Sequence, residues 1–162
     1  MIGLYAGSFD PVHLGHLDII EAASDRCSEL YVVAVWNPAK HDGLLSLEDR
    51  RQLLEACVCH LHNVNVTTYE GLLVRLADQF HADALIRGAV REHVSEIQMA
   101  VTNNELGTIP TLLISCKAEH RHISSSLVRR MLIDGGVGTV ESLVPAAVYD
   151  WLGANNDHLS LA

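Results

Sequence analysis

Two histidines, His13 and His16, stand three residues apart in the segment GSFDPVHLGH, residues 7–16. An apolar run precedes this segment and a helical pattern follows it, so a strand is expected to turn into a helix here. Gly7 permits a sharp turn, and Gly15 leaves room for another group to approach. His16 falls on the first helical turn, where free N–H groups and the positive helix end favour an anion. Capping or surface histidines are the alternative, and two imidazoles alone are too few ligands for a metal.

A second candidate phosphate site is HISSSLVRR, residues 122–130. Serine is a strong helix N-cap, so one of the three serines needs no further role. Three hydroxyls, the free N–H groups of a helix start and the following Arg129 and Arg130 could hold a phosphate, although the arginines could equally form a solvated helix face. The chain contains no P-loop sequence.

Two further cations follow apolar runs: Lys40 in NPAKHD and Arg87 in LIRGAV. A lysine in a loop is usually solvated. Arg87 is held between a strand end and Gly88, and its fork of N–H donors suits a phosphate. Both side chains are therefore candidate phosphate contacts.

The segment CVCHLH, residues 57–62, looks like a metal cluster but ends an amphipathic helical pattern. Side chains on a helix face each other when they are three or four residues apart, not two. Cys57 and Cys59 are therefore predicted to point nearly opposite ways, as core or surface thiols that share no metal.

The candidate residues do not include a set for nucleophilic catalysis. The chain has no G-x-S-x-G elbow, and Cys116 is the one cysteine near a predicted strand end. Imidazoles, a lysine, arginines, hydroxyls and helix N-termini fit phosphate chemistry without a covalent intermediate, which depends on positioning and charge stabilisation.

These side chains must be positioned by alternating strands and helices. Apolar runs at 2–6, 30–35, 64–68, 84–86 and 111–115 alternate with helical patterns at 14–26, 46–60, 72–80, 91–106 and 124–134, and a last helix lies near 139–152. The alternation predicts an α/β fold: a single Rossmann-like, doubly wound domain with a five-stranded parallel sheet in the order 3-2-1-4-5, flanked by helices. Residues 1–152 form the predicted domain and 153–162 a tail. All the candidate segments after strands then meet at one edge of the sheet.

The composition narrows the function classes. Of 162 residues, 49% are hydrophobic and 19% charged, so a folded domain is expected. The net charge of −9 argues against nonspecific binding to nucleic acid or membranes. With no signal-peptide pattern or membrane-length apolar run, a soluble cytosolic protein with free thiols is expected.

GSFDPVHLGH resembles the (T/S)-F-D-P-x-x-x-G-H signature of the nucleotidylyltransferase superfamily, and ISSS resembles its second, ISSS/T-type signature. Over nearly the whole chain, the spacing and length look most like the bacterial phosphopantetheine adenylyltransferases. The resemblance implies transfer of the adenylyl group of ATP to 4′-phosphopantetheine by direct in-line attack, giving dephospho-coenzyme A and pyrophosphate. It also implies Mg²⁺ as cofactor and a cytoplasmic homo-oligomer, commonly a hexamer.

The resemblance also implies residue roles. His16 would stabilise the pentavalent α-phosphoryl group, while Lys40 and Arg87 would hold the acceptor phosphate or the transition state. The substrate-binding residues would be Ser8, Lys40, Leu73, Arg87 and Asn103. The nucleotide-binding residues would be Ser8, Phe9, His16, Gly88, Ala89, Val90, Arg91, Glu96, His120, Arg121, His122, Ile123, Ser124, Ser125 and Ser126. Asp10 would brace the turn, and His13 falls on a variable position with no assigned role.

The chain departs from the family pattern in three places. Val90 stands where the family's R-G-(L/I)-R has its second arginine, and Arg91 follows one residue later. His120 replaces a common aromatic residue and could stack on a base, and Asn104 replaces a common basic one. The alternatives are therefore the same chemistry with another acceptor or nucleotide, of the nicotinamide mononucleotide or glycerol-phosphate type, or a nucleotide-binding regulator that has lost catalysis.

Overall fold

The structure is a computed structural model that describes residues 1–36, 43–70, 73–89, 109–156 and 159. Its centre is a five-stranded sheet in the order β3-β2-β1-β4-β5, in which every neighbouring pair is parallel. The strands are β1 (Ile2–Gly7), β2 (Glu29–Val35), β3 (Val64–Tyr69), β4 (Ala84–Gly88) and β5 (Thr111–Ile114). The predicted strand order is confirmed.

Five helices are described: α1 (Leu14–Ser24), α2 (Leu47–Val58), α3 (Leu73–Gln79), α5 (Ser125–Gly135) and α6 (Ala146–Ala154), with 3-10 turns at 118–120 and 137–139. The predicted helix over 91–106 lies outside the described residues. The predicted last helix began too early, because α6 starts only after Pro145, which takes the N-cap position. Proline fits a helix start, where its missing N–H would have had no helical partner. The helix also runs two residues into the predicted tail, to Ala154.

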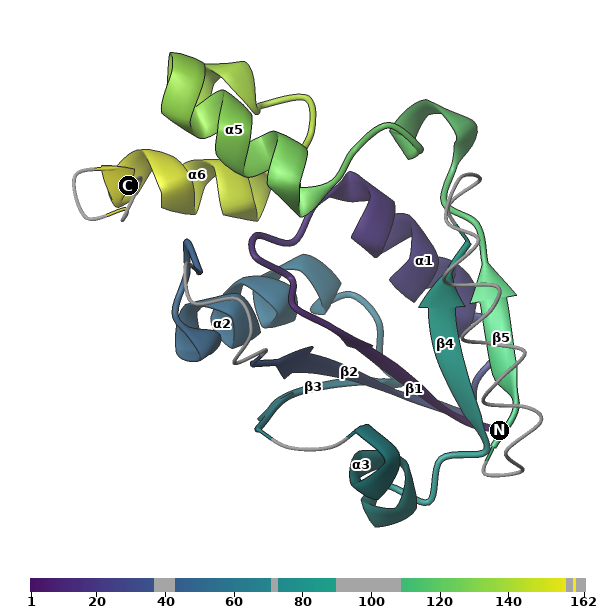
Figure 1. Ribbon diagram of the computed structural model, residues 1–162. Coiled ribbons are helices and arrows are strands. Elements are labelled where there is room, and N and C mark those ends of the chain that lie inside the picture. The colour runs from purple at the N-terminus through teal and green to yellow at the C-terminus, as the bar shows by residue number, and fades with distance from the viewer. Residues whose placement is uncertain (37–42, 71–72, 90–108, 157–158, 160–162) are drawn as a thin grey trace.

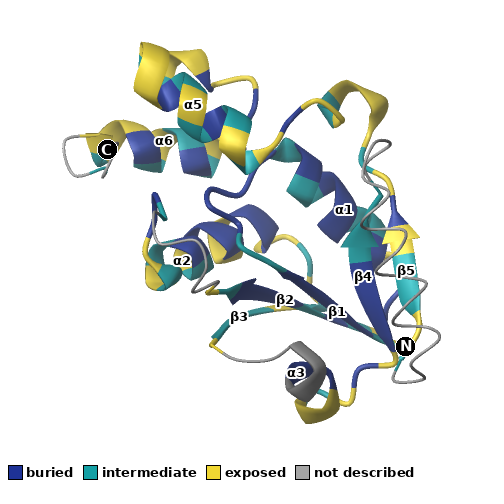
Figure 2. Ribbon diagram, viewed as in Figure 1, coloured by how far each residue is buried: buried dark blue, intermediate teal, exposed yellow. Residues whose placement is uncertain are grey.

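Helices cover both faces of the sheet, as Figure 1 shows: α1 and α2 lie on one face and α3 on the other. The strand residues divide accordingly. Tyr5 and Val32 belong to the larger core beneath α1, α2, α5 and α6, whereas their neighbours Leu4 and Val33 belong to a smaller core with Leu76 of α3. Because successive strand residues point to opposite faces, both sides of β1 and β2 are apolar. Figure 2 accordingly shows β1 buried along nearly its whole length.

The two cysteines at the end of α2 are separated as predicted. Cys57 is buried and Cys59 is exposed. Burial, followed by the nearby Cys59, raises the pKa of Cys57 to about 12, which makes it an unreactive core thiol. Within the described residues, no helix has the length and apolar character that a membrane crossing needs.

Candidate active site

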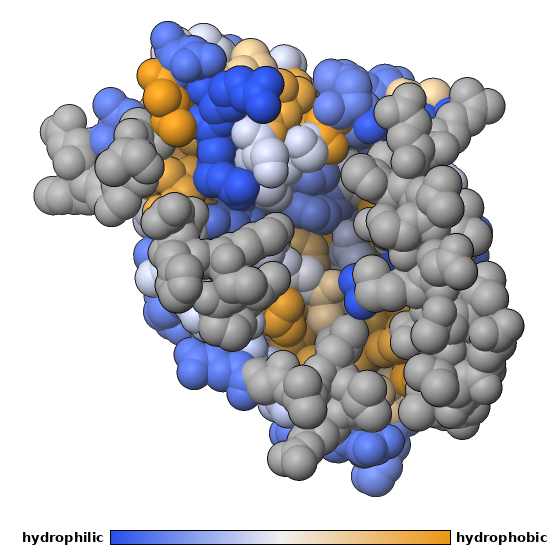
Figure 3. Space-filling model, in the orientation of Figure 1, coloured by the Kyte–Doolittle hydropathy of each residue, from blue (hydrophilic) through white to orange (hydrophobic). Residues whose placement is uncertain are grey.

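Among the described residues, the parallel sheet brings three of the predicted site segments to one edge. The loops that follow β1, β4 and β5 all leave from the carboxyl ends of their strands, and α1 and α5 begin there (Figure 1). Figure 3 shows that this face is hollowed between α5 and the sheet, with hydrophilic side chains gathered over α5. Ligands of doubly wound folds bind at this edge, near the point where the strand order reverses.

The turn after β1 depends on Phe9, not on Gly7. Phe9 has a positive φ of 45°, and its ring is fully buried beside Tyr5. A Cβ at Gly7 would lie 3.1 Å from the Phe9 ring, so Gly7 is needed for close packing. Phe9 was predicted along the nucleotide phosphates, and in this structure the whole residue, its backbone included, is 0% exposed. Ser8, directly before it, remains partly exposed.

His13 and His16 form a stacked pair at the start of α1. Their ring centroids lie 3.7 Å apart, and Phe9 packs edge-on against His16 at 4.9 Å. His13 is the N-cap residue, as one alternative predicted, but it is buried and therefore not a surface histidine. Gly15 does leave room for an approaching group, because a Cβ there would lie 3.1 Å from the His13 ring. The expectation of several free N–H groups is partly wrong, since Leu14 donates to the Leu143 carbonyl.

One backbone hydrogen bond determines which nitrogen of His16 carries the proton. The His13 N–H donates to His16 Nδ1 at 3.3 Å. A nitrogen that accepts a hydrogen bond has no proton, so the neutral ring must carry its proton on Nε2. Burial, and then the nearby His13, lowers the pKa of His16 well below its ordinary value. His16 is therefore a neutral donor at neutral pH.

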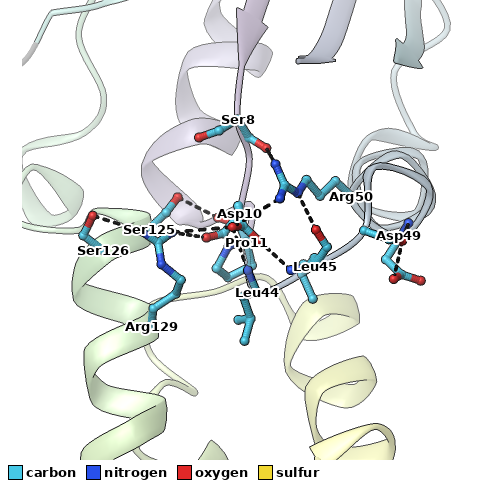
Figure 4. Close-up of polar contacts among 11 residues, drawn as sticks. Ser8, Asp10, Pro11, Leu44, Leu45, Asp49, Arg50, Ser125, Ser126 and Arg129 are labelled. Atoms are coloured by element: carbon cyan, nitrogen blue, oxygen red, sulfur yellow. Dashed lines mark hydrogen bonds and ion pairs between the residues drawn. The ribbon is translucent and has the colours of Figure 1, made fainter. Parts of the chain in front are cut away.

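Asp10 braces the turn, as predicted, through a fully occupied carboxylate. Its Oδ2 and Oδ1 accept from the Leu44 and Leu45 amides, each at 2.9 Å, and Oδ2 lies 3.3 Å from Arg50 Nη2 (Figure 4). The side chains of Asp10 and Arg50 are 6% and 4% exposed. A buried carboxylate with this many donors joins the β1–α1 loop rigidly to the start of α2.

Arg50 was not predicted as a site residue, although its position in the helical pattern of α2 indicates that it is buried. It occupies the third position after the Leu47 start of α2, between two charged neighbours that suggest a solvated face. Its spacing to Leu53, Leu54 and Cys57 is three, four and seven, however, which places Arg50 on the buried stripe of the helix. A charged residue on an apolar stripe marks a buried ion pair.

The three serines at the start of α5 have different partners. Ser124 is the N-cap and accepts from the Leu127 amide at 3.1 Å, as predicted for one of them. Ser125 donates from its hydroxyl to the Pro11 carbonyl at 2.9 Å, and Ser126 accepts from Arg129 Nη2 at 3.3 Å. The first amides of an α-helix have no partner within the helix, so this end of α5 offers donors to an anion.

Arg129 and Ser125 bring the two signature segments into direct contact. Arg129 Nη1 donates to the Asp10 carbonyl and lies 3.9 Å from Asp10 Oδ2 (Figure 4). Arg129 is thus not merely part of a solvated face, whereas Arg130 is exposed. The β1–α1 loop and the α5 N-terminus form one structural unit with hydroxyls, amides and a guanidinium at its surface.

A second buried carboxylate, Asp18 of α1, holds the loop that precedes α5. Its Oδ2 lies 2.6 Å from His120 Nδ1 and accepts from the Lys117 amide at 3.0 Å, and its Oδ1 lies 3.1 Å from Lys117 Nζ. Burial alone would raise the pKa of Asp18, but the hydrogen bonds from His120 and Lys117 outweigh it and lower the pKa. The predicted nucleotide contact His120 is therefore fixed in place by a residue that the sequence reasoning missed.

The remaining predicted site residues fall into two groups. Arg87 is half-buried at the end of β4, and Gly88 lets Ile19 of α1 approach within 2.8 Å of where a Cβ would be. The Ala89 amide donates to the Ile114 carbonyl. Arg121 and His122 are exposed, while Ile123 is buried, so its side chain is part of the core. Those outside the described residues are Lys40, Val90, Arg91, Glu96, Asn103 and the side chain of Leu73, which begins α3.

Comparison with known proteins agrees with this arrangement. Residues 4–131 match the Cytidylyltransferase-like family. A phosphopantetheine adenylyltransferase of Alkaliphilus oremlandii is 40% identical over 151 residues, covering 91% of this chain and 94% of the relative. A phosphopantetheine adenylyltransferase of Gloeobacter violaceus is 44% identical over 148 residues, covering 90% of each.

Solved structures confirm the fold. A structure described as a nicotinate-nucleotide adenylyltransferase from Vibrio parahaemolyticus superposes with a TM-score of 0.66 at 20% identity, covering 93% of this chain and 97% of that one. The fold, the joined signature segments and the similarity over most of both sequences give one result: this chain belongs to the Cytidylyltransferase-like family and, within it, to the phosphopantetheine adenylyltransferases.

Proposed function

We propose that this protein transfers the adenylyl group of ATP to 4′-phosphopantetheine, giving dephospho-coenzyme A and pyrophosphate. The observation that carries the proposal is the direct bond between the two signature segments, Ser125 Oγ to the Pro11 carbonyl, across 114 residues of sequence. That bond places the donors of α5 beside the loop that leads into His16. The names of the relatives supply the substrate pair.

The reaction is a single in-line displacement. A phosphate oxygen of 4′-phosphopantetheine forms a bond to the α-phosphorus of ATP as the bond from that phosphorus to the bridging oxygen breaks, and pyrophosphate leaves with the electron pair. A phosphate monoester has a second pKa of about 6, so the nucleophile is ionised at neutral pH and needs no strong base. The protein's task is to position the reactants and stabilise the developing charge.

His16 is the residue that we place at the α-phosphoryl group. As a neutral ring with its proton on Nε2, it donates a hydrogen bond to an oxygen on which negative charge increases. The backbone amides of Ser124, Ser125 and Ser126, the hydroxyls of Ser124 and Ser126, and Arg129 would hold the β- and γ-phosphates at the start of α5.

The other predicted contacts complete the proposal. Ser8, Lys40 and Arg87 would hold the acceptor phosphate, and Leu73 and Asn103 would line the pantetheine arm. Further nucleotide contacts would come from Phe9, Gly88, Ala89, Val90, Arg91, Glu96, His120, Arg121, His122 and Ile123. The structure supports this because Ser8 follows β1, Arg87 lies at the end of β4 and His120 follows β5, all at the carboxyl ends of parallel strands.

Mg²⁺ is proposed as the ion that accompanies ATP. Mg²⁺ at nucleotide sites is held mainly by phosphate oxygens and water, where it neutralises phosphate charge. The described residues contain no group of three metal-ligating side chains, and both oxygens of Asp10 are engaged by protein donors. The ion would therefore arrive with the nucleotide.

The cytoplasmic location and the hexameric assembly implied by the family are part of the same proposal. Light scattering on the purified protein would measure the number of subunits, and cell fractionation would locate the enzyme. A monomer in solution would contradict the assembly without affecting the proposed chemistry.

The test of the function is pyrophosphate release from ATP and 4′-phosphopantetheine by the wild type and by His16→Ala. Removing one donor to developing charge commonly costs about 100- to 1,000-fold in kcat, and we expect a loss in that range. His60→Ala, which changes an exposed histidine of the loop after α2, is the matched control and should retain activity. Near-normal turnover by His16→Ala would overturn the proposed role of His16.

The same assay separates the alternative acceptors. Each nucleoside triphosphate is paired with 4′-phosphopantetheine, nicotinamide mononucleotide and glycerol 3-phosphate in turn. A clear preference for another pair would replace the proposed substrates. ATP binding in a calorimeter, with no pyrophosphate from any pair, would show a nucleotide-binding regulator instead.

A further inference from the structure

Arg50 of α2 contacts the β1–α1 loop from the interior of the protein. Its guanidinium makes three polar contacts: Nε donates to the Leu45 carbonyl at 2.9 Å, Nη1 to the Ser8 carbonyl at 3.2 Å, and Nη2 pairs with Asp10 at 3.3 Å. The Trp36 ring centroid lies 5.7 Å from its Cζ. With 3% of its surface exposed, Arg50 is shielded from solvent and serves the structure around it.

The contact with Ser8 fixes the direction of a peptide group at the site. The Ser8–Phe9 peptide is trans, so its carbonyl and its N–H point in opposite directions. Because the carbonyl points to Arg50, the Phe9 N–H must point away from it. Figure 4 shows the Ser8 hydroxyl directed away from Arg50 as well. Phe9 as a whole is 0% exposed, whereas Ser8 is partly exposed, so the group of this segment that can reach a ligand at the surface is the Ser8 hydroxyl.

This peptide needs such an anchor because of the backbone at Phe9. A φ of 45° is unfavourable for a residue with a side chain, and it persists only where surrounding contacts enforce it. The buried Phe9 ring fixes one side of the turn, and the hydrogen bond from Arg50 to Ser8 fixes the other.

Gly43 shows how closely the guanidinium is fitted. A Cβ at this position would lie 2.4 Å from Arg50 Nη2 and 3.5 Å from Asp10 Oδ2. The absence of a side chain at Gly43 is therefore what admits the guanidinium tip. Alanine there would displace the tip of Arg50 without removing any charge.

We infer that Arg50 is a positioning residue for the adenylyl transfer, which holds the Ser8–Phe9 peptide so that the Ser8 hydroxyl faces the reacting phosphates. The inference rests on the proposed function, because that function supplies the phosphates. Arg50 itself touches no substrate. It acts through the backbone of the loop, and its fork geometry is what the role requires.

Two variants test the inference. Arg50→Lys keeps the positive charge beside Asp10 but cannot hold Leu45, Ser8 and Asp10 at once, and Gly43→Ala displaces the guanidinium by its methyl group. A small misplacement of reacting groups costs up to about 100-fold, so we expect both variants to lose about 10- to 100-fold in kcat/KM. Arg51→Lys is the matched control, since Arg51 pairs with Glu48 and Glu55 on the exposed side of α2, and it should equal the wild type.

A second measurement separates positioning from loss of structure. In ¹H–¹⁵N spectra, a non-hydrolysable ATP analogue should shift the Phe9 amide strongly in the wild type and in Arg51→Lys. In Arg50→Lys and Gly43→Ala that shift should shrink, while Gly43→Ala keeps a single cooperative urea transition, which shows that the variant is folded. If Arg50→Lys does not fold, Gly43→Ala decides alone.

The outcomes distinguish this inference from the proposed function. If the wild type releases pyrophosphate and Gly43→Ala matches it in both activity and Phe9 amide shift, the role of Arg50 is overturned and the function stands. If the wild type releases none with 4′-phosphopantetheine, the function fails, and the amide shifts with the ATP analogue still report whether Arg50 orients the peptide.

Discussion

Two buried carboxylates hold this site together, and they do so differently. Asp10 binds the start of α2 through two backbone amides and the buried Arg50, with Arg129 of α5 nearby. Asp18 binds the loop before α5 through Lys117, whose side chain is 59% exposed, and through His120. The first junction braces the β1–α1 loop, and the second braces the loop that precedes α5.

The two junctions differ in how rigidly they hold their loops. The Asp10 junction is shielded from water, because the side chains of Asp10 and Arg50 are 6% and 4% exposed. The partners of Asp18 are less shielded: the side chain of Lys117 is 59% exposed and that of His120 is 18% exposed. We therefore expect the β1–α1 loop to be held more rigidly than the loop over 117–124.

The largest expected effect comes from Asp10→Asn. In the variant, the side-chain NH₂ group of asparagine replaces one carboxylate oxygen that accepts hydrogen bonds. One backbone amide then loses its acceptor, and Arg50 stays buried without a counter-charge. Breaking a buried ion pair by removing one partner typically costs about 3–5 kcal/mol of unfolding free energy. Urea denaturation measures it. Asp49→Asn, the same change at a residue whose carboxylate accepts from Ser46 at an exposed contact, is the control and should cost less than 1 kcal/mol, roughly. Equal losses would show that the buried junction is no stronger than the exposed contact.

A smaller effect is expected from acid at the histidine pair between the two junctions. Burial, and then His120, lowers the pKa of His13 to about 4, whereas an unfolded histidine has a pKa of about 6.5. Between these values the unfolded chain binds a proton that the folded protein excludes, so stability falls as pH falls from about 6.5 to about 4. The full contribution is on the order of 3 kcal/mol.

The matched variant for this prediction is His13→Gln, which is neutral throughout. Urea midpoints measured from pH 7 to pH 4 should fall less steeply for the variant than for the wild type. Some slope will remain, because His16 also has a lowered pKa and contributes with the same sign. Identical slopes in the two proteins would contradict the assignment of this acid sensitivity to His13.

The fold could be predicted from the sequence because its signals are local. Apolar runs alternating with helical patterns imply a parallel sheet, and the handedness of crossovers leaves few strand orders. The last helix was misplaced because Val140, Leu143 and Val144 are buried apolar residues of a turn. Their spacing imitates a helix that in fact begins after Pro145.

The site could be predicted only in part, because its organising residues are defined by long-range contacts. The proposed ligand contacts lie mostly in motifs, whereas Arg50 and Asp18 lie in ordinary helices and contact Ser8 and His120, which are 42 and 102 positions away in the sequence. Both are charged residues at apolar positions of a helix: Asp18 shares its buried face with Gly15, Ile19 and Ala23. A search for such misplaced charges would have identified both.

The smallest of these effects on stability is expected when Asp18, the second buried carboxylate, is changed. Asp18→Asn keeps the size of the side chain but loses the charge that His120 and Lys117 bind. Hydrogen bonds to charged groups contribute about 1.5–3 kcal/mol, and because Lys117 is largely solvated we expect a loss of unfolding free energy near the lower end of this range at pH 7.

Because the folded pKa of Asp18 is lowered, its contribution to stability is present above the unfolded pKa of about 3.9 and is lost as pH falls through the folded pKa. The difference in unfolding free energy between wild type and variant should therefore shrink below pH 4. The KM for ATP should rise in the variant, because the loop with His120 is released while Asp10 still holds the β1–α1 loop. A difference that persists unchanged into strong acid would show that Asp18 stabilises the loop by packing and not by its charge.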